Sequence, residues 1–325
     1  MATQHTIQPT YRTVDRIHSA PAPHWVGDGF HVNPMFNHMV GDKRTDPFLL
    51  LDYASPKFFS PNDLEQTGSR THGVGEHPHK GFETVTIAYL GEVAHRDSAG
   101  GGGVIKTGDT QWMTAGRGVM HEEFHSPEVS KTGGDFEMVQ LWVNLPAKDK
   151  LTDPRYQHLK GDDTPVIDLT QAGDNVGKVR LIAGEFTTDT QKQHGIGKTF
   201  SPINLWDVTI KAGKTAELNI PKTHNVMLLI RRGEVRVNDG DQSAQAKQLI
   251  TFAKESGAKE SGENGMDTVR LTAGEAGSEI LLMSGEPLNE PIAYRGPFVM
   301  NTDAEIREAM LEFGRGEFGK LSPVS

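Results

Sequence analysis

The stretch GEHPHKGFETVTIAYLGEVAHRDSAGGGGVIKTGDTQWMTAGRGVMHEEFH, residues 75–125, contains two closely spaced pairs of metal-binding side chains. His77 and His79 form the first pair, and His121 and Glu123 form the second. Because side chains alternate between the faces of a β-strand, each pair is expected on one face. Two facing strands would direct three imidazoles and one carboxylate at one point. Such donors suit a divalent first-row metal with positions left open for a substrate.

The sequence between the two pairs favours β-structure. Residues 84–90 are apolar or β-branched, residues 91–92 and 107–109 have the composition of turns, and four glycines occupy 100–103. The chain has 14 histidines, so a lone H-x-H pair would carry little weight. The second pair and the strands expected between the pairs are what indicate a metal site.

Composition predicts an all-β protein of two domains. A chain of 325 residues is long enough for two domains. Its 36 glycines and 18 prolines separate many short apolar runs, which is typical of β-structure. It has no cysteine, which excludes disulfides and thiolate ligands. The net charge of −10 opposes direct nucleic-acid binding, and no apolar run approaches the ~20 residues of a membrane span. No signal-peptide pattern opens the chain, so a cytoplasmic protein is expected.

The expected domains are residues 1–150, which would bind the metal, and residues 175–325. Residues 46–52 (DPFLLLD) and 136–145 predict strands of the first barrel, residues 54–76 predict a loop, and residues 147–173 predict a connector. Trp142 is interpreted as a packing residue in preference to a substrate-stacking one.

The second domain repeats the first weakly. Aligning residues 90–93 (LGEV) with 232–235 (RGEV) places Asn219 and Pro221 opposite His77 and His79, so the second copy is expected to bind no metal. His224 is interpreted as a packing residue. The chain then predicts a C-terminal helix that begins with a capping box at residues 302–305 and packs through Ile306, Met310 and Phe313.

Other side chains near the pairs compete for the role of ligand. Glu83 follows the first pair by four residues and is an alternative carboxylate ligand, although a supporting role is preferred for it. His125 shares the parity of His121 and Glu123, but the following Ser-Pro suggests that the strand ends there. His72 is interpreted as a loop histidine.

The chain resembles the pirin family, a branch of the cupins built from two β-barrels. The resemblance rests on the motifs HPHKGFETVT, HRDS, GDTQWMTAGRGVMHEE, VQLWVNLP, DPFLLLD and GPFVMN, which are spread over nearly the whole chain. Lys80 stands where arginine is frequent in the family, and Glu122 stands where a small residue is frequent.

This resemblance implies one Fe(II)-type site, with His77, His79, His121 and Glu123 as ligands. Mn, Co, Ni and Cu are compatible with the same donors. The resemblance also implies a quercetin 2,3-dioxygenase-like activity on O2 and an aromatic enol such as quercetin. Glu123 is the nearest base and is expected to take the proton of the substrate hydroxyl. The alternative that the resemblance implies is a metal- and redox-dependent regulatory protein that binds a protein partner.

Overall fold

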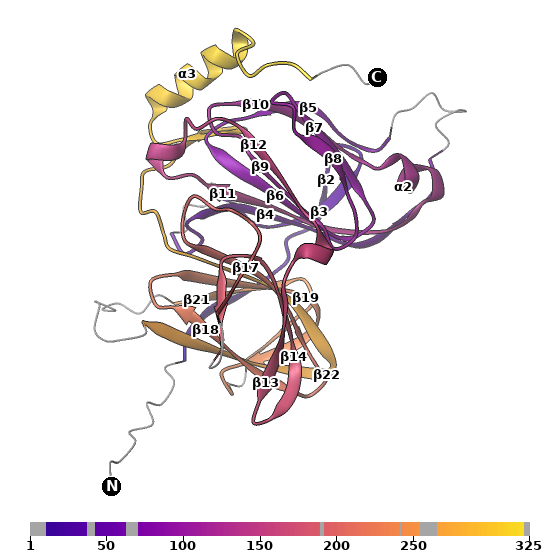
Figure 1. The fold of residues 1–325 in the computed structure, drawn as a ribbon, viewed down its shortest axis with the longest axis vertical. Coiled ribbons are helices and arrows are strands. Elements are labelled where there is room, and N and C mark those ends of the chain that lie inside the picture. Colours follow the sequence, from indigo (N-terminus) through magenta and orange to yellow (C-terminus); the bar gives the residue numbers. More distant parts are fainter. Residues whose placement is uncertain are drawn as a thin grey trace. The chain divides into compact units, whose positions relative to one another are not determined.

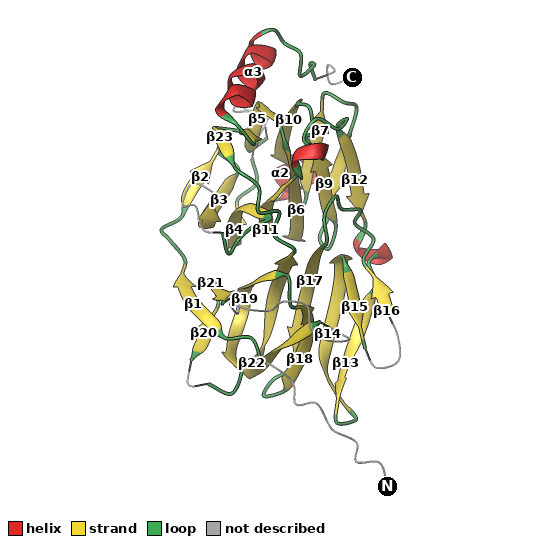
Figure 2. Cartoon of the chain, turned by 90° about the vertical axis from the view of Figure 1, so that its left-hand side faces the viewer, coloured by secondary structure: helices red, strands yellow, loops and turns green. Residues whose placement is uncertain are grey.

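In the computed structural model, strands account for most of the regular structure (Figures 1 and 2). The model describes residues 11–37, 43–62, 71–188, 192–240, 242–253 and 265–321. The helices among them are two, α2 (Pro127–Thr132) and α3 (Asp303–Gly314), besides short 3-10 turns. No helix in these ranges is long and apolar enough to span a membrane. The all-β prediction is therefore confirmed.

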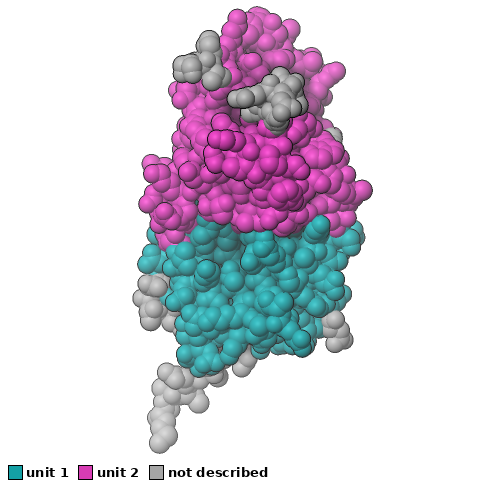
Figure 3. Space-filling view, turned by 90° about the vertical axis from the view of Figure 1, so that its right-hand side faces the viewer, with its two compact units in different colours: residues 1–19, 166–194, 203–287 teal, residues 20–165, 195–202, 288–325 magenta. Residues whose placement is uncertain are grey.

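The chain forms two compact units, coloured separately in Figure 3. Unit 1 comprises Met1–Ser19, Val166–His194 and Ile203–Pro287, and unit 2 comprises Ala20–Pro165, Gly195–Pro202 and Leu288–Ser325. This division differs from the expected ranges 1–150 and 175–325. Strand β1 (Val14–Ser19) belongs to unit 1 because it pairs with β21 (Gln248–Phe252), and the C-terminal helix belongs to unit 2.

Unit 2 contains two antiparallel sheets that share one apolar core. Side chains of both sheets meet in this core, including Phe30, Phe136 and Met138 from one sheet and Val93 and Ile105 from the other. The larger sheet has the order β12-β9-β6-β11-β4-β3-β2, and the smaller has the order β5-β10-β7-β8. The strands are β2 (His24–Val26), β3 (Phe30–Asn37), β4 (Phe48–Phe59), β5 (Gly73–His79), β6 (Phe82–Leu90), β7 (Val93–Asp97), β8 (Gly102–Ile105), β9 (Thr110–Thr114), β10 (Val119–His125), β11 (Gly134–Asn144) and β12 (Arg155–Leu159).

Unit 1 is built on a nine-stranded antiparallel sheet with a larger apolar core. Its main order is β1-β21-β19-β22-β17-β14-β13, with β18 paired to β22 and β20 paired to β19. Trp206, Leu228 and Leu282 are fully buried in its core. The further strands are β13 (Val166–Gln171), β14 (Asp174–Ala183), β17 (Ile203–Ile210), β18 (Thr215–Pro221), β19 (Asn225–Val237), β20 (Ser243–Gln245) and β22 (Met266–Gly285), with a separate hairpin of β15 (Glu185–Thr187) and β16 (Lys192–His194).

Two segments expected to be irregular contain strands. The predicted connector 147–173 includes β12, which pairs with β9, and β13, which pairs with β14 and alternates buried with exposed side chains over residues 166–169. The prediction of a loop over residues 54–76 was partly wrong, because β4 continues to Phe59 and β5 begins at Gly73. Residues 63–70 of that loop lie outside the described residues.

The predicted capping box of the C-terminal helix is confirmed. The Thr302 hydroxyl accepts from the Glu305 amide at 3.2 Å, and the Glu305 carboxylate accepts from the Thr302 amide at 2.8 Å. Ile306 is buried as expected, but Met310 is 39% exposed, so it is not part of the packed face. The strands that precede α3, β23 (Ala293–Arg295) and β24 (Phe298–Met300), form a hairpin, and Phe298 and Met300 of β24 share an apolar cluster with the helix.

Candidate metal centre

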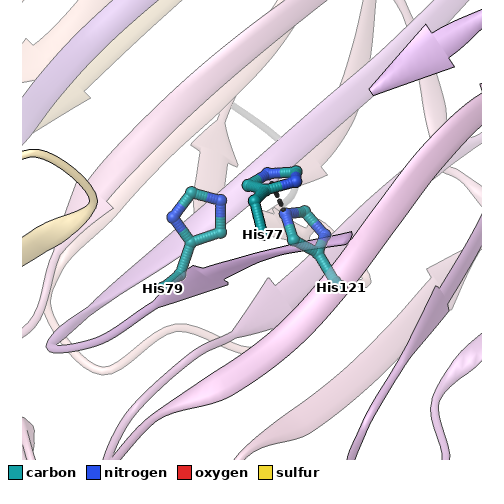
Figure 4. Close-up of side chains that lie close together, drawn as sticks. All are labelled: His77, His79 and His121. Atoms are coloured by element: carbon teal, nitrogen blue, oxygen red, sulfur yellow. Dashed lines mark hydrogen bonds between the residues drawn. The ribbon is translucent and has the colours of Figure 1, made fainter. Parts of the chain in front are cut away.

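Three histidines converge inside unit 2. His77 and His79 extend from β5, His121 extends from the neighbouring antiparallel strand β10, and Figure 4 shows the three rings turned toward one another. One ring nitrogen from each lies within 4.8 Å of the others. The closest approach joins His77 Nε2 and His121 Nε2 at 2.8 Å. The two-residue spacing of the first pair therefore places both imidazoles beside His121, as the sequence predicted.

The proton positions on His77 follow from its hydrogen bond to the backbone. Its Nδ1 lies 2.8 Å from the carbonyl oxygen of Gly75, which can only accept. The neutral ring therefore carries its hydrogen on Nδ1, and Nε2 presents a lone pair toward His121. Outer hydrogen bonds of this kind fix the tautomer of metal-binding histidines.

The tautomer of His121 follows from Gln111. The Gln111 amide nitrogen lies 3.1 Å from the Glu123 carboxylate and 3.1 Å from His95 Nδ1, so it donates to both. His95 Nδ1 is then an acceptor, and His121 Nδ1, 3.4 Å away, is the donor that faces it. The neutral His121 ring consequently has its lone pair on Nε2.

Two nitrogen lone pairs thus face each other, at His77 Nε2 and His121 Nε2. Such an arrangement is repulsive unless a cation lies between them. His79 Nδ1 is also buried and without a hydrogen-bond partner in the structure. The His77 and His121 nitrogens fit a metal ion, because each offers a lone pair in the form that coordination requires, and one ring nitrogen of His79 belongs to the same close group.

Burial keeps the rings neutral. Desolvation lowers the pKa values of His79 and His121 well below the usual range, and the neighbouring histidines lower them further. A hydrogen bond to the Pro297 carbonyl opposes this shift at His79. Both imidazoles are therefore ready to bind a cation at neutral pH without first losing a proton.

Glu123 lies on the same side of β10 as His121. The sequence predicted one group of Glu123 with His77, His79 and His121, but the structure places Glu123 in a second group. It is close to His121 and His95, whereas the His77–His79–His121 group does not include it. Its Oε1 accepts from Thr86 Oγ1 and Gln111 Nε2, each at 3.1 Å. Its assignment as a metal ligand remains a prediction.

His95 was missed by the sequence analysis. It extends from β7, which pairs with β10 and sets His95 opposite Glu123. Its Nε2 lies 3.4 Å from the Asp97 carboxylate, and its ring stacks on Tyr156 at a centroid distance of 5.2 Å. The sequence feature that could have indicated it is the H-x-D spacing within the HRDS motif. This spacing places His95 and Asp97 on one face of a strand, as in the two predicted ligand pairs.

The wider resemblance of the chain agrees with this geometry. The Pirin family model matches residues 29–143, and the Pirin C-terminal cupin domain model matches residues 205–319. A protein of Pseudomonas aeruginosa named "Putative quercetin 2,3-dioxygenase" is 44% identical over 91% of this chain and 94% of its own length. The chain belongs to the pirin family.

Solved structures support the same fold. The crystal structure of a quercetin 2,3-dioxygenase from Acinetobacter baumannii has a TM-score of 0.84 and 45% identity, covering 95% of this chain and 99% of that one. A bacterial pirin from Escherichia coli in complex with nickel(II) has a TM-score of 0.56 and 18% identity, covering 84% and 100%, and bears on the fold alone. The predicted pirin membership and pair of cupin domains are confirmed.

The competing side chains of this pirin-family site lie elsewhere. Glu83 points to the opposite face of β6 from Thr86, accepts from Thr114 at 2.7 Å, and burial raises its pKa to about 7. His125 contacts the Gly29 carbonyl at 2.8 Å, outside both clusters. The position of Glu83 fits the supporting role preferred for it from sequence, and the choice of Glu123 over Glu83 as a ligand stays a prediction.

Two further histidines, His72 and His224, and Glu122 also lie outside the ligand groups. His72 contacts Asp28 near the surface, and Glu122 forms an ion pair with Arg96. His224 is buried in unit 1, where its Nδ1 lies 3.2 Å from the Ser284 hydroxyl. Burial and nearby positive charge lower the pKa of His224 to about 4.

A cavity of about 90 Å³ adjoins the predicted ligands. Trp142 forms part of its wall and also packs on Phe82, at a centroid distance of 4.3 Å, and on His79, at 5.3 Å. It therefore packs as predicted while presenting an aromatic surface to the cavity. The lining residues are Val26, Phe30, Val32, Leu50, Asp52, Val74, His77, His79, Glu123, Met138, Gln140 and Trp142.

We expect one metal ion per chain, because the part of the chain that the structure describes has close groups of metal-binding side chains in one of the two units only. Within the described ranges, groups of three or more close histidine or carboxylate ligands are confined to unit 2. Asn219 and Pro221, aligned with His77 and His79, both lie on β18 of unit 1. Elemental analysis of metal-saturated, gel-filtered protein should give a ratio near one, and two tightly held ions would contradict this expectation.

Asp52 makes the stability of the protein dependent on pH. Burial raises its pKa to about 7, against about 3.9 in an unfolded chain. Between these values the folded state binds more protons than the unfolded state, so this group lowers stability as pH rises. Asp52→Asn should therefore gain stability relative to wild type from pH 4 to pH 8, by about 2 to 4 kcal/mol. Urea denaturation of the metal-free proteins at both pH values measures this, and a difference that is the same at both would contradict it.

Proposed function

We propose that this pirin-family protein is a metal-dependent dioxygenase that opens the ring of quercetin or a related flavonol with O2. The observation that supports it best is the convergence of imidazole lone pairs on one wall of a cavity. The activity named for the Acinetobacter relative, at 45% identity, supports the choice of substrate.

In this proposal His77, His79, His121 and Glu123 hold one divalent transition metal, with Fe(II) expected. The imidazole and carboxylate donors are equally compatible with Mn(II), Co(II), Ni(II) and Cu(II). When bound, the metal supplies Lewis-acid and redox chemistry toward the substrate hydroxyl and O2.

Glu123 is proposed to take the proton of the substrate hydroxyl. A general base needs hydrogen-bond reach of its proton donor, and Glu123 lines the same cavity as the histidines. Gln111 Nε2 donates to Oε1 of Glu123, and the Thr86 hydroxyl lies 3.1 Å from the same oxygen, so both side chains help to hold it in place. Its other carboxylate oxygen is left to face the ligands or the substrate.

The cavity walls are proposed to orient an aromatic ring and to exclude water. Phe30, Val32 and Met138 are buried, and the half-buried Trp142 supplies a ring face. Flat aromatic ligands stack favourably on such faces. A dry environment also strengthens the electrostatic interactions of Glu123 with the reacting proton.

The small size of the cavity favours a second candidate function. Small-molecule sites usually measure about 300 to 1,000 Å³, whereas this cavity measures about 90 Å³. We therefore also propose, as the alternative, a metal- and redox-dependent regulatory protein that binds a protein partner. Both functions use the same ligands, so turnover is what separates them.

The deciding experiment loads the protein anaerobically with Fe(II), adds quercetin and then admits O2. The dioxygenase proposal expects O2 uptake and release of carbon monoxide in equal amounts, with neither in the metal-free protein. Parallel samples loaded with Mn(II), Co(II), Ni(II) or Cu(II) identify the active ion. Metal binding without turnover by any ion would reject the dioxygenase and favour the regulatory protein.

A further inference from the structure

Four polar side chains form a continuous row across the larger sheet of unit 2. Asp52 on β4 pairs with Gln140 on β11, Gln140 pairs with Thr86 on β6, and Thr86 pairs with Gln111 on β9. Directly opposite residues share one face of a sheet. Asp52 and Gln140 both line the cavity beside the predicted ligands, so the row faces the histidines.

In the part of the chain that the structure describes, three of the four side chains in this row are hydrogen-bonded, but Asp52 at its outer end is not. Gln111 donates to His95 and Glu123, and the Thr86 hydroxyl lies 3.1 Å from Glu123 Oε1 and 2.7 Å from Gln140 Oε1. Among the described residues, the Asp52 carboxyl has no hydrogen-bond or ion-pair partner, and burial alone shifts its pKa. The row thus ends at the cavity in an unpaired acid.

Two buried ionisable side chains of unit 2, Glu83 and Lys150, have hydrogen-bond partners, unlike the half-buried Asp52. Glu83 accepts from Thr114, with Arg155 nearby at 3.8 Å. The Lys150 ammonium donates to the carbonyls of Gly81 and Val299 and to the Asn144 side chain, within 2.7–3.0 Å. A buried polar group without partners costs stability. An unpaired acid in a cavity is therefore a candidate for binding a ligand.

We propose that Asp52 accepts a hydrogen bond from a hydroxyl group of the bound ligand, distinct from the group that would face the metal. The apolar walls around it fit an aromatic ring, so the ligand class is a polyhydroxylated aromatic enol. Asp52 then selects such compounds over analogues that carry only the metal-facing hydroxyl and carbonyl. This inference rests on the proposed site but requires only binding and no turnover.

A comparison of two flavonols on redox-inactive, Zn(II)-loaded protein tests the inference. Quercetin carries ring hydroxyls besides its 3-hydroxyl, and 3-hydroxyflavone carries only the 3-hydroxyl. Asp52→Leu should weaken quercetin binding about tenfold or more, equivalent to about 1.4 kcal/mol. It should change 3-hydroxyflavone binding by less than about twofold, because that ligand has no hydroxyl for Asp52. Kd values come from quenching of tryptophan fluorescence.

Glu83→Gln is the matched control. Glu83 is also a buried carboxyl with a raised pKa, but it lies on the face of β6 away from the cavity. We expect unchanged Kd values for both flavonols in this variant. Zinc content and melting temperature confirm that each variant is folded. If Asp52→Leu fails to fold, Asp52→Asn, which keeps the size of the side chain, should show a smaller loss confined to quercetin.

Three results would overturn the inference: equal losses for both flavonols, no loss for quercetin in the Asp52 variants, or no binding of either flavonol by wild type. A loss confined to quercetin, together with absent O2 uptake by the Fe(II)-loaded wild type, would retain the inference and reject the dioxygenase. Failure of the two proposals is therefore distinguishable.

Discussion

Replacing His121 with alanine is expected to lower metal affinity by more than roughly 100-fold, since losing even an outer partner of a ligand typically costs 10- to 100-fold. His121 Nε2 lies 2.8 Å from His77 Nε2, so its ring is central to the cluster. Competition with a chromophoric chelator measures the loss. Turnover of quercetin should disappear with the metal.

The fold should survive this substitution, because the core of unit 2 is an apolar cluster that does not include His121. Circular dichroism of the metal-free variant checks this. His224→Ala is the matched control, since His224 is also buried but lies in unit 1 outside the ligand clusters. Unchanged metal affinity in His121→Ala, or an equal loss in His224→Ala, would refute the assignment of His121 as a ligand.

Replacing Glu123 with glutamine is expected to reduce metal affinity and to lower kcat by about 10²- to 10⁴-fold, the usual contribution of a general base. The amide keeps the size of the side chain and can still accept from Thr86 and Gln111, so the cavity should keep its shape. What is lost is the negative charge and the ability to take a proton. Metal titration and single-turnover kinetics with quercetin separate these two effects.

Glu83→Gln is the control for Glu123→Gln, because Glu83 is the other carboxylate that the sequence offered as a ligand. Its partner Thr114 and its position on the opposite face of β6 predict near-normal metal content, even if activity changes. Equal metal loss in the two variants, or loss only in Glu83→Gln, would move the ligand assignment to Glu83. A normal kcat in metal-loaded Glu123→Gln would exclude Glu123 as the base.

The convergence of His77, His79 and His121 was predictable because it depends on local spacing. His77 and His79 are two residues apart on one strand, and the turns between that strand and His121 allow the two strands to pair. His95 and Gln111 were not predicted, because they reach the site through the pairing of β7 with β10 and of β9 with β6. Alternation along a strand gives the face of a side chain but not its neighbours on other strands.

The same limit applies to the fold. The apolar runs predicted strands of the first barrel and the capping box predicted the C-terminal helix, which spans Asp303–Gly314, because these signals lie within a few residues of one another. The sequence did not show that β1 pairs with β21, more than 200 residues away. The sequence placed Asp52 at the end of a predicted strand, whereas in the structure it lines the cavity. This position could not be predicted, because it depends on how distant strands close the barrel.

The membership of residues 288–325 in unit 2 affects the order in which the protein can mature during synthesis. The carbonyl of Pro297 contacts the ring of His79, and Lys80, the next residue, pairs with Glu312. A nascent chain that has just emerged through residue 165 therefore contains every predicted ligand but not the segment that completes their surroundings. About half of the chain follows residue 165, so the surroundings of His79 and Lys80 can be completed only after this later half has been synthesised.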